Sequence, residues 1–178
     1  MNFQNELNAR FANDDTSPLK NKDRKQFQAL PFFEWNKAYV VIASVRLTPD
    51  APLFKMETTT NRNPLYQQYA VATFLLNGQK QTLKIYQSQD SKFSFDYKDY
   101  LFLPFKDLTN GEETYEGGRY LDVFISNIIN GEILLDFNRA YNPYCAYNHN
   151  YSCPIPPVEN HLNTKIEAGV KKGFIQKD

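Results

Sequence analysis

The chain has 178 residues, and its 20 basic and 20 acidic side chains give a formal net charge of zero. This length suits one domain with one hydrophobic core, and the balanced charge excludes a nucleic-acid binder that relies on a basic surface. Aromatic residues make up 15% of the chain, which excludes a disordered protein because such chains are poor in aromatic residues.

The sequence offers no run of 18 or more apolar residues, so we expect no transmembrane segment. Residues 1–6 lack a basic stretch followed by an apolar one, so no signal peptide is predicted. We therefore expect either a cytoplasmic protein or, if a leader has been removed, a periplasmic or envelope-associated one.

The first 35 residues have the pattern of a helical arm. Residues 1 to about 13 predict a helix, because apolar side chains recur at Phe3, Leu7 and Phe11. A second short helix is expected over residues 21–28, with Asn21 as its N-cap and Phe27 facing inward. The apolar cluster at residues 30–35 is too short for a helix and is expected to dock the arm onto the body of the protein.

From Ala38 onward the apolar residues alternate with polar ones, which predicts β-strands. Strands are expected over residues 38–47, 53–60, 69–76, 79–87, 99–105, 120–128, 132–138 and 164–168. Asn77-Gly78 and Asn130-Gly131 each separate two alternating runs and predict two β-hairpins with type I′ turns. Pro104 cannot donate to a sheet, so strand 99–105 should lie at an edge or end there.

Short strands without intervening helices favour a mainly β fold. We expect a single antiparallel β-barrel or sandwich domain with a short N-terminal helical arm. The arm should span residues 1–35, the β domain residues 36–170, and a C-terminal tail residues 171–178.

The segment from residue 141 to residue 164 has one formal charge, Glu159. It also holds four tyrosines, four of the ten prolines, both cysteines and both histidines. A simple solvated loop would carry more charge, so we expect an ordered loop that packs over the β domain.

Cys145 and Cys153 leave four interpretations open. The favoured one is a disulfide that closes a nine-residue loop. The others are two reduced buried thiols, a zinc site with His149 and His161, and a catalytic Cys145 with a histidine base. The spacing of these four residues is not that of a usual zinc site, so no metal is expected.

A set of charged and amide side chains surrounds the second predicted hairpin and the loop after it: Arg119, Asp122, Asp136, Asn138, Arg139, Asn142, Glu159 and Asn160. One interpretation is a buried hydrogen-bond and ion-pair network that holds the loop. The other is a polar pocket in which Arg119 or Arg139 binds an anionic group and Asp136 or Glu159 acts as an acid or base.

Three stretches carry a resemblance to a known family. They are LFLPFKDLTNGEETYEGGRYLD at residues 101–122, DFNRAYNPYCAY at residues 136–147, and SCPIPPVEN at residues 152–160, which continues to the Ile166-Glu-Ala-Gly169 stretch. They resemble the bacterial "domain of unknown function 1684" family, over about residues 3–170.

The resemblance implies that ten residues belong to the family's motif: Arg119, Tyr120, Asp136, Asn138, Arg139, Asn142, Cys145, Cys153, Glu159 and Asn160. Neither histidine is part of that motif, which disfavours the zinc and Cys/His interpretations. Many relatives look exported, and no catalytic residue is implied.

The favoured hypothesis is a non-enzymatic small-ligand-binding or structural module of the cell envelope. The alternative is a hydrolase-like enzyme with an Asp/Glu/Arg pocket. We expect no cofactor and no nucleic-acid partner, and a small molecule as the ligand.

Overall fold

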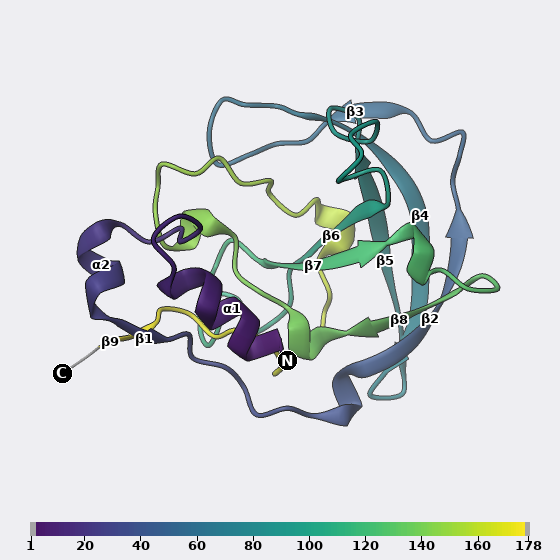
Figure 1. The fold of residues 1–178 in the computed structure, drawn as a ribbon. Coiled ribbons are helices and arrows are strands. Elements are labelled where there is room, and N and C mark those ends of the chain that lie inside the picture. Colours follow the sequence, from purple (N-terminus) through teal and green to yellow (C-terminus); the bar gives the residue numbers. More distant parts are fainter. Residues whose placement is uncertain (1–2, 177–178) are drawn as a thin grey trace.

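The computed structural model describes residues 3–176 and confirms the mainly antiparallel β fold. The sheet curls into a half-barrel, so of the predicted architectures it comes closest to an unclosed barrel (Figure 1). Its strands are β2 (Val40–Leu47), β3 (Leu53–Lys55), β4 (Leu65–Leu76), β5 (Gln79–Ser88), β6 (Tyr100–Phe105), β7 (Arg119–Phe124) and β8 (Glu132–Asp136). Their order is β7-β6-β5-β4-β2-β8, and β3 pairs with β4.

The N-terminal arm contains two helices, α1 (Phe3–Ala12) and α2 (Asn21–Gln26). Residues 1 and 2 of the first predicted helix lie outside the described residues. Leu7 and Phe11 are buried, as their spacing predicts. The second helix is shorter than predicted, and its N-cap is Lys20.

Phe27 lies beyond the end of α2 and is the first residue of β1 (Phe27–Ala29). Its side chain is buried in the core of the arm. The chain returns to this point at its other end, where β9 (Ile175–Gln176) pairs with β1. Residues 177 and 178 of the predicted tail lie outside the described residues.

The first predicted hairpin is confirmed. β4 and β5 pair from Leu76↔Gln79 to Tyr66↔Ser88. The turn residues Asn77 and Gly78 have φ values of 52° and 76°, as a type I′ turn requires.

The second predicted hairpin has its turn but not its strand pairing. Asn130 and Gly131 have φ values of 52° and 77°. However, a short 3₁₀ helix (Ile125–Asn127) ends β7, and the one bridge beside the turn is Ile129↔Glu132. β8 pairs instead with β2, so β7 and β8 end the sheet on its two opposite sides.

Two other predicted strands differ from the structure. Residues 53–60 form a strand only at β3, after which the chain turns toward the 141–164 loop and pairs at Thr58↔Pro154. Residues 164–168 form no strand. Their carbonyl groups at Ile166 and Ala168 instead accept hydrogen bonds from the side chain of Arg119.

The main core fills the half-barrel with side chains from every large strand and from residues 162–168. A second core joins the arm to the start of the 141–164 loop, where Phe11 contacts the rings of Tyr144 and Tyr147. The loop is ordered, as expected, and includes two 3₁₀ turns at Tyr144–Ala146 and Val158–Asn160. No helix within residues 3–176 is long and apolar enough to cross a membrane.

Candidate functional site

The half-barrel is open between its two end strands, β7 and β8, which lie side by side without pairing (Figure 1). The opening is tied at one end by the bridge Tyr120↔Tyr141 and at the other by Ile129↔Glu132. Between these points both strands line one pocket of about 450 Å³. We call this pocket the seam pocket; its volume is within the range of small-molecule sites.

The seam pocket has apolar side chains both at its floor and at its rim. The floor is formed by buried core residues: Leu121, Val123 and Leu135. The rim carries three large apolar side chains that are strongly exposed: Phe124 at 39%, Leu134 at 62% and Ile129 at 66%. Three such side chains around one opening favour a binding surface over a chance distribution.

Asp122 lies on the pocket wall as the acceptor of two hydrogen bonds. The hydroxyl groups of Tyr100 and Tyr141 donate to its Oδ1 at 2.9 and 2.6 Å. Burial raises the pKa of both tyrosines well above their ordinary value. Both hydroxyls therefore stay protonated at neutral pH and continue to donate to the carboxylate.

Asp136 and Arg139 come from the end of β8 and the 3₁₀ turn that follows it (Phe137–Arg139). Asp136 Oδ1 accepts from the backbone N–H of Asn138 at 3.0 Å and from its side-chain amide at 2.8 Å. The Arg139 guanidinium lies 5.1 Å from the centre of the Phe3 ring. Within residues 3–176 no ion pair of Arg139 is found, so its charge is available to a ligand.

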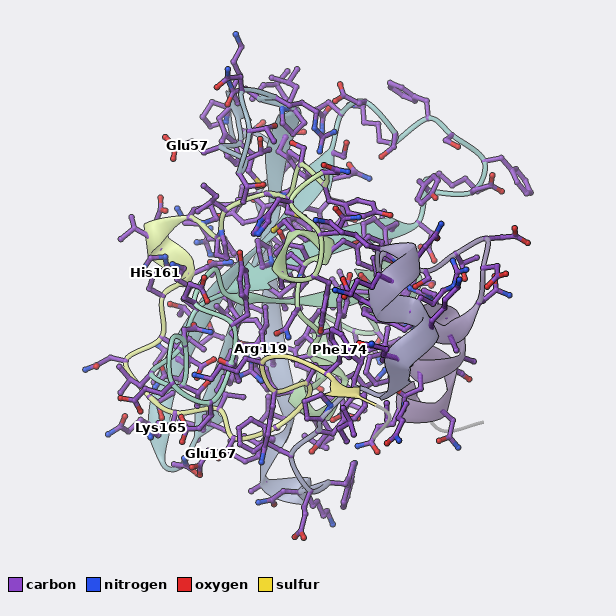
Figure 2. All side chains as sticks on the ribbon, turned by 90° about the vertical axis from the view of Figure 1, so that its left-hand side faces the viewer. Glu57, Arg119, His161, Lys165, Glu167 and Phe174 are labelled. Atoms are coloured by element: carbon purple, nitrogen blue, oxygen red, sulfur yellow. The ribbon has the colours of Figure 1, made fainter. Side chains whose placement is uncertain are left out.

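Arg119 lines neither of the two pockets in which the other predicted charged residues lie. Its side chain is 0% exposed and pairs with Asp107 at 2.8 Å, which is also fully buried. The same guanidinium donates to the carbonyl oxygens of Ile166 at 2.8 Å and of Ala168. Figure 2 shows Arg119 in the interior of the molecule. Burial lowers the pKa of Arg119 against the opposing effect of Asp107.

The predicted asparagines bind backbone groups that join distant segments. Asn138 accepts from the N–H of Asn36 at 2.9 Å and donates to its carbonyl at 3.0 Å. Asn142 donates to the carbonyl of Lys171 at 2.9 Å.

Asn160 lies between β5 and β6, where the two strands separate. It accepts from the Lys84 N–H at 2.8 Å and donates to the carbonyl groups of Lys84 at 2.8 Å and Pro104 at 2.7 Å. The strands themselves pair only at Tyr86↔Phe102. Pro104 has no N–H that could donate to a strand on the β5 side of β6. Because Asn160 and not a strand lies on that side, Pro104 is tolerated inside the sheet rather than at its edge.

Glu159 lies in a different cleft from Asp136. It pairs with Lys84 at 3.1 Å and lines a cleft of about 600 Å³ with β3, β5 and residues 155–158. A backbone hydrogen bond and the Lys84 ammonium lower the pKa of Glu159. The structure therefore does not bring Asp136 and Glu159 together as the acid and base of one site.

The predicted disulfide is wrong for this structure. Cys145 and Cys153 are buried free thiols that lie 3.3 Å apart without a bond. The Cys145 N–H donates to Cys153 Sγ at 3.2 Å, and the Cys153 N–H donates to Thr59 Oγ1 at 3.1 Å. A hydrogen bond from the Cys153 thiol lowers the pKa of Cys145 to about 6, while the pKa of Cys153 is raised.

The two histidines do not join the cysteines. The Nε2 atom of His161 lies 3.1 Å from the carbonyl oxygen of Pro156. The side chain of His149 is exposed. Among residues 3–176 no group of three or more His, Cys, Asp or Glu side chains is arranged to hold a metal ion.

Sequence reasoning missed two parts of the site. Asp107 carries no local signal of burial. The pairing of Phe105 with Arg119 brings it near Arg119, and residues 166–168 return to cover the pair. The apolar rim was also missed, because Phe124, Ile129 and Leu134 read as ordinary strand residues. Because β7 and β8 do not pair, these three side chains lie at the edge of an opening.

The comparison with curated proteins found no match to the chain. Among solved structures, it is similar to the uncharacterized protein from gene locus rrnAC0354 of Haloarcula marismortui, determined by solution NMR. The two are 34% identical, the match covers 94% of this chain and 89% of that one, and the TM-score is 0.73. The model of the family described as "Protein of unknown function (DUF1684)" matches residues 25–171. The chain therefore belongs to the DUF1684 family.

Proposed function

We propose that the protein is a non-enzymatic binding module whose seam pocket takes a small amphipathic molecule with an anionic head group. The observation that carries this proposal is the opening between β7 and β8, with its apolar floor and strongly exposed apolar rim. An apolar ligand body would cover the rim and leave the head group beside the polar residues at the end of β8.

The feature of the lining that supports an anionic head is Arg139, beside the two carboxylates Asp122 and Asp136. Asp122 and Asp136 each have one carboxylate oxygen already bonded, to two tyrosine hydroxyls and to the Asn138 amide groups. Arg139 is the one cation that lines the seam pocket among the described residues, and its guanidinium lies over the face of Phe3. A carboxylate or sulfonate can therefore pair with Arg139 without breaking an existing ion pair.

Octanoate tests this proposal, with 1-octanol as its neutral counterpart. Titration calorimetry should show saturable octanoate binding that Asn127→Trp abolishes, because Asn127 lines the pocket and an indole there would fill it. Arg139→Gln should weaken octanoate binding roughly two- to fivefold, the value of a solvent-exposed ion pair, and leave octanol binding unchanged.

The matched controls are Asn163→Trp and Arg46→Gln, two exposed positions outside the seam pocket. Both should bind octanoate as the unmodified protein does. Equal loss of affinity in Arg46→Gln and Arg139→Gln would contradict a specific role for Arg139, and unchanged binding by Asn127→Trp would contradict the pocket.

A second surface favours association with the cell envelope. The connection between β5 and β6 projects from the body of the molecule (Figure 2). At its tip Phe93 is 88% exposed and Phe95 83% exposed, and Tyr97 follows at 53%. The ammonium groups of Lys92 and Lys98 lie 4.9 Å from the ring centres of Phe93 and Phe95. Exposed phenylalanines capped by lysine side chains suit the interface of a phospholipid bilayer.

We infer that this tip inserts shallowly into a membrane surface, which would place the protein at the envelope. The protein should co-sediment with phosphatidylcholine vesicles, and Phe93→Ser/Phe95→Ser should reduce the bound fraction severalfold, because each ring buries apolar area in the bilayer. Leu47→Ser/Leu75→Ser is the matched control, since both leucines are exposed elsewhere. An equal loss in both double variants, or no sedimentation with vesicles, would contradict membrane insertion.

A further inference from the structure

The single tryptophan of the chain, Trp35, is exposed and lies in one pocket with two residues of the C-terminal segment, Glu167 and Lys171. Trp35 is 62% exposed. It lines a surface pocket of about 470 Å³ with two other aromatic residues, Phe33 and Tyr39, and two carboxylates, Glu34 and Glu167. We call this pocket the aromatic pocket. It shares no residue with the seam pocket.

The wall of the aromatic pocket is held by backbone hydrogen bonds between two extended segments. The N–H of Phe33 donates to the carbonyl of Gly169 at 3.0 Å, and the N–H of Lys171 donates to that of Pro31 at 2.8 Å. Asn36 is fixed by its two hydrogen bonds with Asn138. The aromatic side chains are therefore presented from a rigid backbone, which lowers the entropic cost of binding.

The pocket already holds one cation of the protein itself. The ammonium group of Lys171 lies 4.7 Å from the centre of the Phe33 ring, a cation–π distance. Figure 2 shows Glu167 at the surface of the molecule, in contrast to the buried Arg119. In the part of the chain that the structure describes, no ion pair engages Glu34, Glu167 or Lys171. Aromatic faces with unpaired carboxylates are the surroundings in which proteins bind organic ammonium groups.

We propose that the aromatic pocket is a binding site for a small organic cation, and that Lys171 competes with this ligand for the face of Phe33. The ligand cation takes the place of the Lys171 ammonium over the face of Phe33, in the pocket that Glu34 and Glu167 also line. Lys171 then turns to solvent, which its long side chain permits without movement of the backbone. The site is independent of the small-ligand function proposed for the seam pocket.

Choline is the probe, and its neutral isostere 3,3-dimethylbutan-1-ol is the control ligand. Because Trp35 is the single tryptophan, its fluorescence and its one indole N–H resonance report binding without a label. Choline should change both signals saturably, and the isostere should bind at least about fivefold more weakly, the loss expected for a cation–π contact. Glu167→Gln should weaken choline binding severalfold.

Lys171→Met gives the most specific result. It should tighten choline binding about threefold to tenfold, because it frees the face of Phe33. Lys172→Met removes an equal charge from the next residue, which donates to the carbonyl of Gly111 and does not line the pocket. It should leave the affinity within about twofold, since an exposed charge outside the site is largely screened.

Three results would overturn the proposal. The first is equal binding of choline and its neutral isostere, and the second is an equal effect of the two lysine variants. The third is the absence of a saturable signal up to tens of millimolar choline in both the unmodified protein and Lys171→Met. Binding of a neutral sugar such as glucose in place of choline would assign the pocket to carbohydrates and would equally contradict a cation site.

Discussion

Replacing Arg119 by methionine should lower the free energy of unfolding by about 3–5 kcal/mol, the cost of leaving one partner of a buried ion pair uncompensated. Asp107 would lose its cationic partner where no solvent can replace it, since both side chains are 0% exposed. The carbonyl groups of Ile166 and Ala168 would also lose their donor. Chemical denaturation of the purified variant measures this loss.

Three further variants serve as controls for the effect of Arg119→Met. Arg46→Met removes an exposed arginine and should change stability by less than about 0.5 kcal/mol. Arg119→Lys retains the charge but fewer hydrogen bonds, and should be intermediate. Arg119→Met/Asp107→Asn should lose less than the sum of the two single changes, because the uncompensated charge is removed. Near-native stability of Arg119→Met would show that the buried pair does not hold residues 166–168 in place.

Replacing Asn160 by alanine should cost about 3 kcal/mol, because three backbone groups of β5 and β6 would lose their partners at once. These are the N–H and carbonyl of Lys84 and the carbonyl of Pro104. No strand can replace Asn160 there, since β5 and β6 are already apart at this position. Denaturation gives the overall loss. Amide hydrogen exchange shows where it occurs, at Lys84 and at Lys106, whose N–H donates to the Asn160 carbonyl at 2.9 Å.

Asn163→Ala is the matched control, because Asn163 is exposed in the same segment. Asn160→Asp should be as destabilising as the alanine variant or more so, since a carboxylate cannot donate to the two carbonyl groups. Unchanged amide exchange at Lys84 in Asn160→Ala would contradict the bridging role of this side chain.

The sequence predicted the local structure better than the long-range pairing. Asn77-Gly78 and Asn130-Gly131 both form the predicted turns, because positive φ is decided by the turn residues themselves. Only the first turn joins two paired strands. β8 found its partner in β2, about 90 positions earlier in the chain, and no local pattern encodes such a choice.

The candidate site was predicted in part for the same reason. Asp122, Asp136 and Arg139 do line one pocket, although β7 and β8 do not pair as the arms of the predicted hairpin. Arg119 and Asn160 read as polar residues of a pocket, but the chain buries them against segments that are distant in sequence. The cysteine spacing permits both a disulfide and two thiols, so the spacing alone could not decide between them.

We propose that the opening between β7 and β8 binds an amphipathic anion. The most direct measurement is a titration of the isotope-labelled protein with octanoate, followed by the backbone amide resonances. The amides of residues 121–124 and 134–136 should shift together and saturably, with the Arg139 side chain, while those of residues 51–57 and 155–159 stay in place. Shifts confined to the cleft that Glu159 lines, shifts confined to residues 93–97, or no shifts at all would contradict this proposal.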